Sequence, residues 1–331
     1  MFNKAIAMVG GGSWATALVK VLNENDHRIS WWLRDENAVD HLVRKHHNKN
    51  YLSSISFRPE LINPSNNLEN VIRLNDIIFL AVPATFLPIV LRDCLPEDFQ
   101  GKIVVSAIKG MIPDKNQIIA EYLQQQFDIP FENIVIVSGP SHAEEVALEK
   151  LSYLTLACPD EAVSLAICEL LNCNYLRCIS SDDIYGTEYG AVLKNIYALA
   201  AGICHGLGYG DNFQAVLISN AIEEMESFVK AVHPISRDIK KSAYLGDLLV
   251  TAYSQFSRNR TLGAMIGKGY SVKSALLEMN MVAEGYNAAR CIHEVNKQYH
   301  VPLLISEATY RILYEGANAR DEMQKMSERL S

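Results

Sequence analysis

The segment Lys4-Ala5-Ile6-Ala7-Met8-Val9-Gly10-Gly11-Gly12-Ser13-Trp14-Ala15 decides the fold. A short apolar run, typical of a buried β-strand, leads directly into three glycines and then into a helical pattern. Gly10 permits a tight turn, Gly12 lets a ligand approach the main chain, and Ala15 is small enough for close packing of helix on strand. The free N–H groups of the helix start are suited to phosphate. The context predicts a dinucleotide-binding turn; a plain glycine-rich turn is the alternative.

Short apolar runs alternate with helical patterns over the first half of the chain. This alternation is typical of an α/β domain with a mostly parallel, Rossmann-like sheet. A helix is expected around Glu161–Leu171. The predicted strands are Lys4–Val9, His27–Leu33, Asp76–Val82, Lys102–Ala107, Asn133–Ser138, Leu154–Ala157 and Tyr175–Ile179.

The strand patterns disappear from Asp183 onward, and helical patterns follow one another to the end of the chain. At 331 residues the chain exceeds what a single hydrophobic core usually organises. The polar segment Ser180–Asp183 marks the boundary. We therefore predict a dinucleotide-binding domain over residues 1–182 and an all-helical substrate-binding and catalytic domain over residues 183–331.

Composition and charge exclude several classes of protein. Apolar residues make up 49% of the chain and charged residues 21%, as in ordinary globular proteins. The net charge is −8 and no segment forms a strong basic block, which argues against a nucleic-acid partner or an anionic membrane surface. The longest apolar stretch, residues 77–91, contains Pro83 and Pro88 and is too short to cross a bilayer. We expect no integral membrane contact.

The seven cysteines predict a reducing compartment. Their number is odd, none forms a C-x-x-C pair, and no signal peptide is recognisable. The spacing of Cys173 and Cys178 matches no zinc pattern, so no metal site is expected. We expect a cytoplasmic protein, with a homodimer as the commonest form of a soluble oligomer.

The end of the second predicted strand carries a base where NAD-specific folds usually carry an acid. Arg34 stands there, followed by Asp35. An arginine can pair with the 2′-phosphate of NADP, whereas an acid binds the ribose hydroxyls of NAD. Arg34 therefore permits NADP as well as NAD, unless it is only a solvated surface arginine.

Two predicted strand ends carry groups suited to an anionic or carbonyl ligand. Lys109 follows the strand Lys102–Ala107, and Ser138-Gly139-Pro140-Ser141 closes the strand Asn133–Ser138. Open α/β sheets bind ligands at the carboxyl ends of their strands. We expect Lys109 to project into this crevice; an ordinary surface lysine is the alternative.

Lys194 interrupts a helix that is otherwise almost entirely apolar or small. An unpaired ammonium is costly to bury, and a buried lysine has a lowered pKa that lets it exchange protons near neutral pH. Gly190, Lys194 and Tyr197 share a face at helical spacing, so Gly190 could leave room beside the lysine. The alternative is a lysine that extends to solvent.

Two later segments place charges at expected helix starts. Asp247 follows Gly246, where a simple helix cap is the alternative to a functional acid. Ser257-Arg258-Asn259-Arg260 brings two cations together, and the helix dipole disfavours them there unless an anion is bound. Arg258 is suited to a fork-like phosphate contact, with a solvated arginine as the alternative.

These motifs together resemble bacterial-type NAD(P)-dependent glycerol-3-phosphate dehydrogenase. In chain order they are GGGSWA (10–15), AIKG (107–110), SGPS (138–141), YGAVLKN (189–195), LGDL (245–248), SRNR (257–260) and VAEG (282–285). The resemblance implies interconversion of sn-glycerol 3-phosphate and dihydroxyacetone phosphate, with NADP or NAD as cofactor and a supply of glycerol 3-phosphate for phospholipid synthesis.

The resemblance also implies residue roles. Lys194 matches the proton donor and acceptor, with Lys109 and Asp247 beside it in the catalytic set. The positions matching substrate contacts are Lys109, Gly139, Ser141, Lys194, Asp247, Ser257, Arg258 and Asn259. The positions matching cofactor contacts, beside Gly10 and Gly12, are Ser13, Trp14, Arg34, Lys109, Ala143, Arg258, Val282 and Glu284.

The chain departs from the family pattern near these motifs. Tyr244 and Leu245 stand where smaller residues are usual, and Tyr209 adds an aromatic side chain that we expect near the mouth of the active site. Two other functions stay open. One is a two-domain dehydrogenase of another hydroxy acid, against which Ser257–Arg260 argues. The other is a catalytically silent NAD(P)-binding sensor, which would have no need of a proton-transfer lysine.

Overall fold

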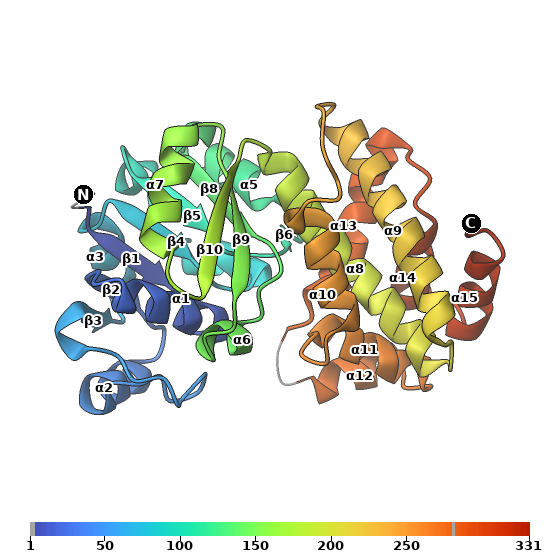
Figure 1. Cartoon of the computed structure of the whole chain (residues 1–331), viewed down its shortest axis with the longest axis horizontal. Coiled ribbons are helices and arrows are strands. Elements are labelled where there is room, and N and C mark those ends of the chain that lie inside the picture. The colour runs from blue at the N-terminus through green and yellow to red at the C-terminus, as the bar shows by residue number, and fades with distance from the viewer. Residues whose placement is uncertain (1–3, 280–281) are drawn as a thin grey trace. The chain divides into compact units, whose positions relative to one another are not determined.

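The apolar runs of the first half form a single sheet of eight strands in a computed structural model, which describes residues 4–279 and 282–331 (Figure 1). The strand order is β10-β9-β8-β5-β4-β1-β2-β3, and all neighbours are parallel except β8 and β9. The strands are β1 (Ile6–Val9), β2 (Ile29–Trp32), β3 (Ile62–Ser65), β4 (Ile77–Leu80), β5 (Ile103–Ser106), β8 (Ile134–Ser138), β9 (Ser152–Ala157) and β10 (Leu176–Ser181). The expected Rossmann-like α/β fold class is confirmed.

The central strands are apolar on both sides because helices cover both faces of the sheet. Ile6 and Met8 of β1 belong to the core under α1 and α7, whereas Ala7 and Val9, on the opposite face, are equally buried. The helices of this part are α1 (Ser13–Glu24), α2 (Glu36–Lys45), α3 (Leu68–Arg73), α4 (Leu87–Val90), α5 (Ile119–Phe127), α6 (Ala143–Ala147) and α7 (Glu161–Leu171), with short turns η1 (Pro59–Leu61), η2 (Ala84–Phe86), η3 (Pro96–Phe99) and η4 (Phe131–Asn133).

The sequence patterns did not predict strand β3. It contains Asn63 and Pro64, residues that are rare in strands, and it pairs with β2 alone at the edge of the sheet. An edge strand needs hydrogen bonds on one side only, so a proline is tolerated there.

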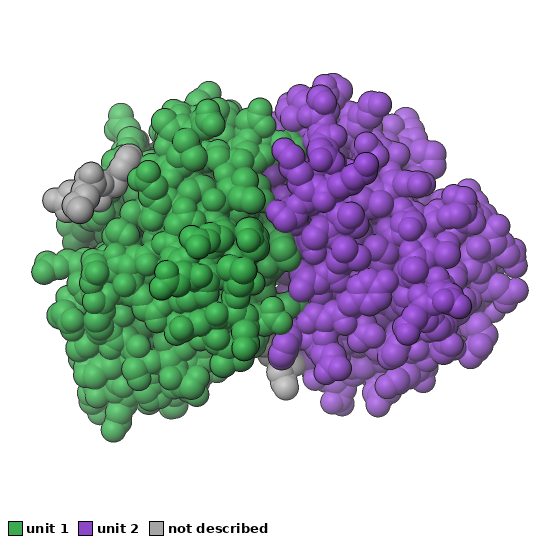
Figure 2. Space-filling model, in the orientation of Figure 1, with its two compact units in different colours: residues 1–108, 119–184 green, residues 109–118, 185–331 purple. Residues whose placement is uncertain are grey.

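The contacts divide the chain into two units, coloured separately in Figure 2. Unit 1 is the chain up to Ile108 together with Ile119–Ile184; unit 2 is Lys109–Ile118 together with Tyr185–Ser331. The segment Lys109–Ile118, which our sequence boundary left in the first domain, therefore belongs with the helices. It contains the short antiparallel strands β6 (Met111–Ile112) and β7 (Gln117–Ile118), and β6 contacts helix α13.

Unit 2 is otherwise helical, as the patterns after Asp183 indicate. Its helices are α8 (Ile184–Gly206), α9 (Asp211–Val232), α10 (Asp247–Tyr253), α11 (Arg258–Gly267), α12 (Val272–Glu278), α13 (Glu284–Tyr299), α14 (Leu304–Tyr314) and α15 (Ala319–Ser327), with a π-helical turn η5 (Ser242–Gly246) before α10. Among the described residues, none of the helices is both long enough and apolar enough to span a membrane.

Helices α8 and α11 pack main chain against main chain through glycines. A Cβ atom at Gly202 would lie 2.1 Å from the carbonyl oxygen of Arg260, and one at Gly263 would lie 2.1 Å from that of Leu199. Gly206 and Gly267 form a second contact of the same kind one turn further on. This close approach holds α11 against the C-terminal half of α8.

A buried carboxylate fixes another helix of unit 2. Glu224 on α9 accepts hydrogen bonds from the main-chain N–H groups of Ile305 and Ser306 and from the Ser306 hydroxyl, so it satisfies the first turn of α14. Burial raises the pKa of Glu224 to about 7, although these donors favour its charged form. Burial raises the pKa of the nearby Tyr197 hydroxyl, and the Glu224 charge adds to this effect.

Candidate active site

Three charged side chains of unit 2 meet in one buried cluster. The Lys194 ammonium, from the middle of α8, forms an ion pair with Asp247, the first residue of α10. The Lys109 ammonium lies 3.6 Å from the other carboxylate oxygen of Asp247. The side chains of Lys194 and Asp247 are only 4% and 1% exposed, and that of Lys109 is 20% exposed. One carboxylate is therefore shared between two lysines.

The environment brings the pKa of Lys194 into the physiological range. Burial lowers this pKa to about 7 because the ammonium loses its hydration. The Asp247 carboxylate opposes the effect, and the nearby Lys109 charge adds to it. A lysine with such a pKa can both donate and accept a proton near pH 7.

The helix that carries Arg258 begins where the sequence indicated. Ser257 is the N-cap of α11, and its hydroxyl oxygen accepts a hydrogen bond from the Arg260 main-chain N–H. Ser257 and Asn259 are buried, whereas Arg258 is exposed at the first turn. An exposed arginine at a helix N-terminus provides both a guanidinium and main-chain donors to an anion.

The amide of Asn259 is connected to Asn195, a residue that our sequence reasoning did not select. Asn259 donates to the Asn195 side-chain oxygen over 2.9 Å, and the Asn195 amide nitrogen donates to the Lys109 carbonyl oxygen over 2.9 Å. A polar residue in an apolar, buried helix needs such partners. That requirement, applied to Asn195 as it was to Lys194, would have identified it.

The glycine turn of unit 1 has the geometry that a dinucleotide pyrophosphate requires. Gly10 has a φ of +129°, and a Cβ atom there would lie 2.4 Å from the Ala81 carbonyl oxygen, so only glycine fits. A Cβ atom at Gly12 would meet open space. Gly12 is the N-cap of α1 and no side chain caps that helix, which leaves its first N–H groups for an anionic ligand.

The turn is held from behind by Asn48, another residue missed from the sequence. Its amide nitrogen donates to the Gly11 carbonyl oxygen over 3.0 Å and to the Thr16 hydroxyl over 2.8 Å. Its side-chain oxygen accepts from the main-chain N–H groups of Asn50 and Tyr51. Asn48 lies in a polar loop segment, where one asparagine among several carries no distinguishing signal.

The structure divides the predicted cofactor-contacting residues between the units. Of those in unit 1, Ser13 and Trp14 form the first turn of α1, Arg34 is exposed after β2, and Ala143 is buried at the start of α6. α6 packs against α1. The remaining ones, in unit 2, are Lys109, Arg258, Val282 and Glu284, the last being the first residue of α13.

Gly139 and Ser141, predicted from the SGPS motif to contact the substrate, lie after β8 in unit 1. Gly139 has a φ of +113°, and a Cβ atom there would lie 2.8 Å from the Tyr153 carbonyl oxygen. The Ser141 hydroxyl donates to the Gly139 carbonyl oxygen over 3.1 Å. The backbone conformation of this turn therefore requires glycine at position 139.

Two expectations about the surroundings of Lys194 are wrong. Gly190 does not leave room for a ligand, because the ring of Tyr244 fills that space, 3.1 Å from where a Cβ atom would stand. Tyr209 does not lie near Lys194. It packs against Phe213 beyond the C-terminal end of α8, and that end is about 18 Å from Lys194 along the helix. Leu245 is partly buried in the turn before Asp247.

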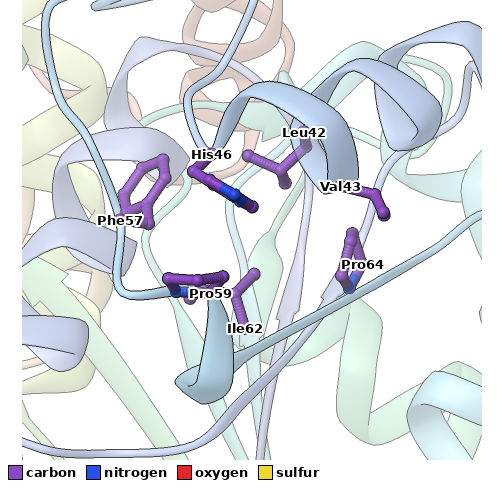
Figure 3. A pocket seen from close by; sticks show the side chains of 7 residues that line it. All are labelled: Leu42, Val43, His46, Phe57, Pro59, Ile62 and Pro64. Carbon is purple, nitrogen blue, oxygen red and sulfur yellow. The ribbon is translucent and has the colours of Figure 1, made fainter.

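An apolar pocket of unit 1 is lined by none of these residues. It has a volume of about 110 Å³ and lies between α2 and β3 (Figure 3). Its lining is Leu42, Val43, His46, Phe57, Pro59, Ile62 and Pro64, none of which we predicted to be functional. Within residues 4–279 and 282–331, no group of three or more histidine, cysteine, aspartate or glutamate side chains is arranged to hold a metal ion.

A parallel sheet with an uncapped glycine turn, joined to a helical unit with a buried lysine–aspartate pair, defines a two-domain nicotinamide-dependent dehydrogenase. Comparison with known proteins agrees. The model of the NAD-dependent glycerol-3-phosphate dehydrogenase N-terminus matches residues 5–164, and that of the C-terminus matches residues 183–324. The chain therefore belongs to the NAD-dependent glycerol-3-phosphate dehydrogenase family.

Full-length relatives support this assignment. The chain is 35% identical to the glycerol-3-phosphate dehydrogenase (NAD(P)+) of an Exiguobacterium species, over 98% of this chain and 95% of that protein. It is 34% identical to that of Listeria monocytogenes serotype 4a, over 99% and 97%. The crystal structure of the glycerol-3-phosphate dehydrogenase from Coxiella burnetii superposes with a TM-score of 0.91 at 27% identity, covering 99% of this chain and 100% of that one. The expected NAD(P)-dependent oxidoreductase of glycerol 3-phosphate is confirmed.

Proposed function

We propose that this chain interconverts sn-glycerol 3-phosphate and dihydroxyacetone phosphate with Lys194 as its proton donor and acceptor. The observation that carries the assignment is the buried Lys194–Asp247 pair with a lysine pKa of about 7. In the reducing direction the Lys194 ammonium gives a proton to the oxygen that develops negative charge at the substrate carbonyl. In the oxidising direction the neutral amine removes the hydroxyl proton.

The neighbouring groups orient this lysine and bind the substrate. Asp247 holds the Lys194 amine in place through their ion pair, and Lys109 adds positive potential for the developing oxyanion. Arg258, with Ser257 and Asn259 beside it, is suited to anchor the phosphate at the start of α11. Gly139 and Ser141 are proposed to contribute from unit 1.

The cofactor role follows from the residues of the glycine turn. When bound, the dinucleotide supplies or accepts the hydride. Gly10, Gly12, Ser13 and Trp14 are proposed to receive its pyrophosphate, Arg34 its adenine-ribose end, and Ala143, Lys109, Arg258, Val282 and Glu284 further parts. Asp35 caps α2 through the Asn37 N–H, so Arg34 is the charged group at the end of β2 that remains for a 2′-phosphate. This arrangement supports NADP as well as NAD.

We further propose a biological setting. Glycerol 3-phosphate is the backbone precursor of glycerophospholipids, so the reducing direction supplies phospholipid synthesis. A cytoplasmic location and a homodimer are the accompanying proposals. The substrate is a small phosphorylated molecule, and the net charge of −8 argues against a nucleic-acid partner.

The test is the initial rate of dihydroxyacetone phosphate reduction with NADPH and with NADH, in the native chain and in Lys194→Ala. We expect rapid turnover of the native chain and a fall of at least about 10³-fold in the variant, with nearly unchanged cofactor binding. Lys230→Ala is the matched control, because Lys230 is exposed on α9. Full activity of Lys194→Ala would rule out its role, and an inactive native chain would refute the proposed reaction.

A further inference from the structure

A series of hydrogen-bonded side-chain amides connects four separate segments of unit 2. The Lys109 carbonyl oxygen accepts from the Asn195 amide nitrogen, the Asn195 side-chain oxygen accepts from the Asn259 amide nitrogen, and the Asn259 side-chain oxygen accepts from the Gly285 N–H. Each of the three hydrogen bonds is 2.9 Å long, and both asparagines are buried. The connected segments are the start of the β6–β7 hairpin, the middle of α8, the first turn of α11 and the first turn of α13.

The groups at the two ends of this series, the Lys109 carbonyl and the Gly285 N–H, determine the orientation of both amides. A carbonyl oxygen at Lys109 can only accept, so Asn195 must present its nitrogen to it and its oxygen to Asn259. A main-chain N–H at Gly285 can only donate, which requires the Asn259 oxygen there and agrees with the first orientation. No other arrangement satisfies all the groups, and a buried amide left without a partner would be costly.

Gly285 also allows α13 to approach α8 closely at Asn195. A Cβ atom at Gly285 would lie 2.6 Å from the Asn195 main-chain oxygen and 3.0 Å from the Asn259 side-chain oxygen. The first turn of α13 is therefore pressed against α8 at Asn195.

We propose that Asn195 is a positioning residue, which holds the main chain at Lys109 so that the Lys109 ammonium stays beside Asp247 and Lys194. The proposal rests on the role of Lys194 proposed above. Lys194 and Asn195 are adjacent on α8 and point in different directions, so the helix reaches the Lys109 segment through Asn195 and the Asp247 carboxylate through Lys194. Lys109 is also the residue at which the chain passes from unit 1 into unit 2, where its main chain needs an anchor.

The proposal predicts an effect that a merely structural residue would lack. The charged groups that act on Lys194 are Asp247 from α10, which raises its pKa, and Lys109 from the hairpin segment, which lowers it. If Asn195→Ala releases Lys109, the like charge moves away and the pKa of Lys194 rises. We expect a rise of about half a pH unit or more, and a roughly tenfold fall in kcat at the optimal pH because Lys109 is displaced.

The first experiment measures the titration of Lys194 directly, from the ¹³Cε chemical shift of labelled lysine in the cofactor-free protein. The signal is assigned as the one missing in Lys194→Ala. This readout needs no turnover, so it tests the inference even if the proposed reaction is refuted. Asn195→Ser, which also cannot reach the Lys109 carbonyl, replaces Asn195→Ala if that variant does not fold.

The matched control is Gln214→Ala. Gln214 is a buried amide on α9 that donates to the Ala201 carbonyl oxygen of α8 over 3.0 Å, on a part of α8 distant from the cluster. It should cost comparable thermal stability and leave the Lys194 titration unchanged. A similar rise of the Lys194 pKa in Gln214→Ala would assign the effect to general loosening and overturn the proposal.

The second experiment asks whether Asn195 acts through Lys109. In a Lys109→Ala background the like charge is already absent, so Asn195→Ala should cause no further rise of the Lys194 pKa. The native protein, Asn195→Ala, Lys109→Ala and the double variant are then compared in the pH dependence of kcat/KM for dihydroxyacetone phosphate reduction. An unchanged Lys194 titration in Asn195→Ala, or an equal rise with and without Lys109, would overturn the proposal.

Discussion

At the scale of residues, the chemistry depends on one carboxylate that two lysines share in a buried site. Lys194 and Lys109 both face Asp247, so the cluster carries a net positive charge when Lys194 is protonated. In a buried site this charge is poorly screened, which favours a phosphorylated substrate and an oxyanion in the transition state. Burial and, to a smaller extent, the Lys109 charge lower the pKa of Lys194, whereas the Asp247 carboxylate raises it.

The pH dependence of the two reaction directions should therefore be opposite. In the mechanism proposed above, reduction requires the Lys194 ammonium. This form is lost as pH rises through its pKa of about 7, so kcat/KM for dihydroxyacetone phosphate should fall there. Oxidation requires the neutral amine, so kcat/KM for glycerol 3-phosphate should rise over the same range. Initial rates in both directions between about pH 6 and pH 9 measure this. Parallel profiles for the two directions would contradict the assignment of Lys194.

At the scale of elements, the loop that carries Asn48 supports the glycine turn at the start of α1. Asn48 donates to Gly11 and Thr16 and accepts from Asn50 and Tyr51, so one side chain holds the glycine turn and the loop together. A turn that is already in its binding conformation loses less entropy when the ligand arrives.

Replacing Asn48 with alanine should weaken cofactor binding. The Gly11 carbonyl and the Thr16 hydroxyl would each lose a hydrogen bond worth about 1 kcal/mol, and we expect the Kd for NADPH to rise about fivefold to tenfold. Fluorescence titration with NADPH measures the change. The control is Asn75→Ala, because Asn75 is an equally buried amide of unit 1 that donates to the Val71 carbonyl oxygen within the α3 region. Equal NADPH affinities of the two variants would show that Asn48 has no special role.

At the scale of the whole molecule, the two units have hydrophobic cores that are built from different elements. Unit 1 is organised by a sheet with apolar residues on both faces, and unit 2 by helices around α8. Within unit 2 the glycine pairs of α8 and α11 set the distance between the helix that carries Lys194 and the helix that begins at Arg258. The stability of that packing and the relative positions of Lys194 and Arg258 are thus linked.

A single methyl group at this contact should destabilise unit 2. In Gly263→Ala the new Cβ atom would stand 2.1 Å from the Leu199 main-chain oxygen, which cannot move aside without separating the helices. We expect a loss of about 3 kcal/mol in the free energy of unfolding, measured by thermal or denaturant unfolding. Gly210→Ala is the control, because a Cβ atom there meets open space. A change in Gly263→Ala no larger than in Gly210→Ala would mean that the helices are not in main-chain contact.

The sequence by itself determined the features that depend on neighbours along the chain. The order of strands and helices, the glycine turn before Ser13 and the start of α11 after Ser257 follow from periodicity and local backbone geometry. Lys194 was recognisable for the same reason, since a lone charge stands out in an apolar helix. The roles of the cofactor-contacting and substrate-contacting residues stay predictions.

Only the tertiary structure decided which distant groups meet. Strand β3, the assignment of Lys109–Ile118 to unit 2 and the filling of the space beside Gly190 by Tyr244 could not be read from local patterns. The partners of Asn48 and Asn195 belong to the same class. An asparagine has the same local preferences whether its amide faces water or a carbonyl from a segment far away in the chain. The packing of the helices and strands determines which of these it meets.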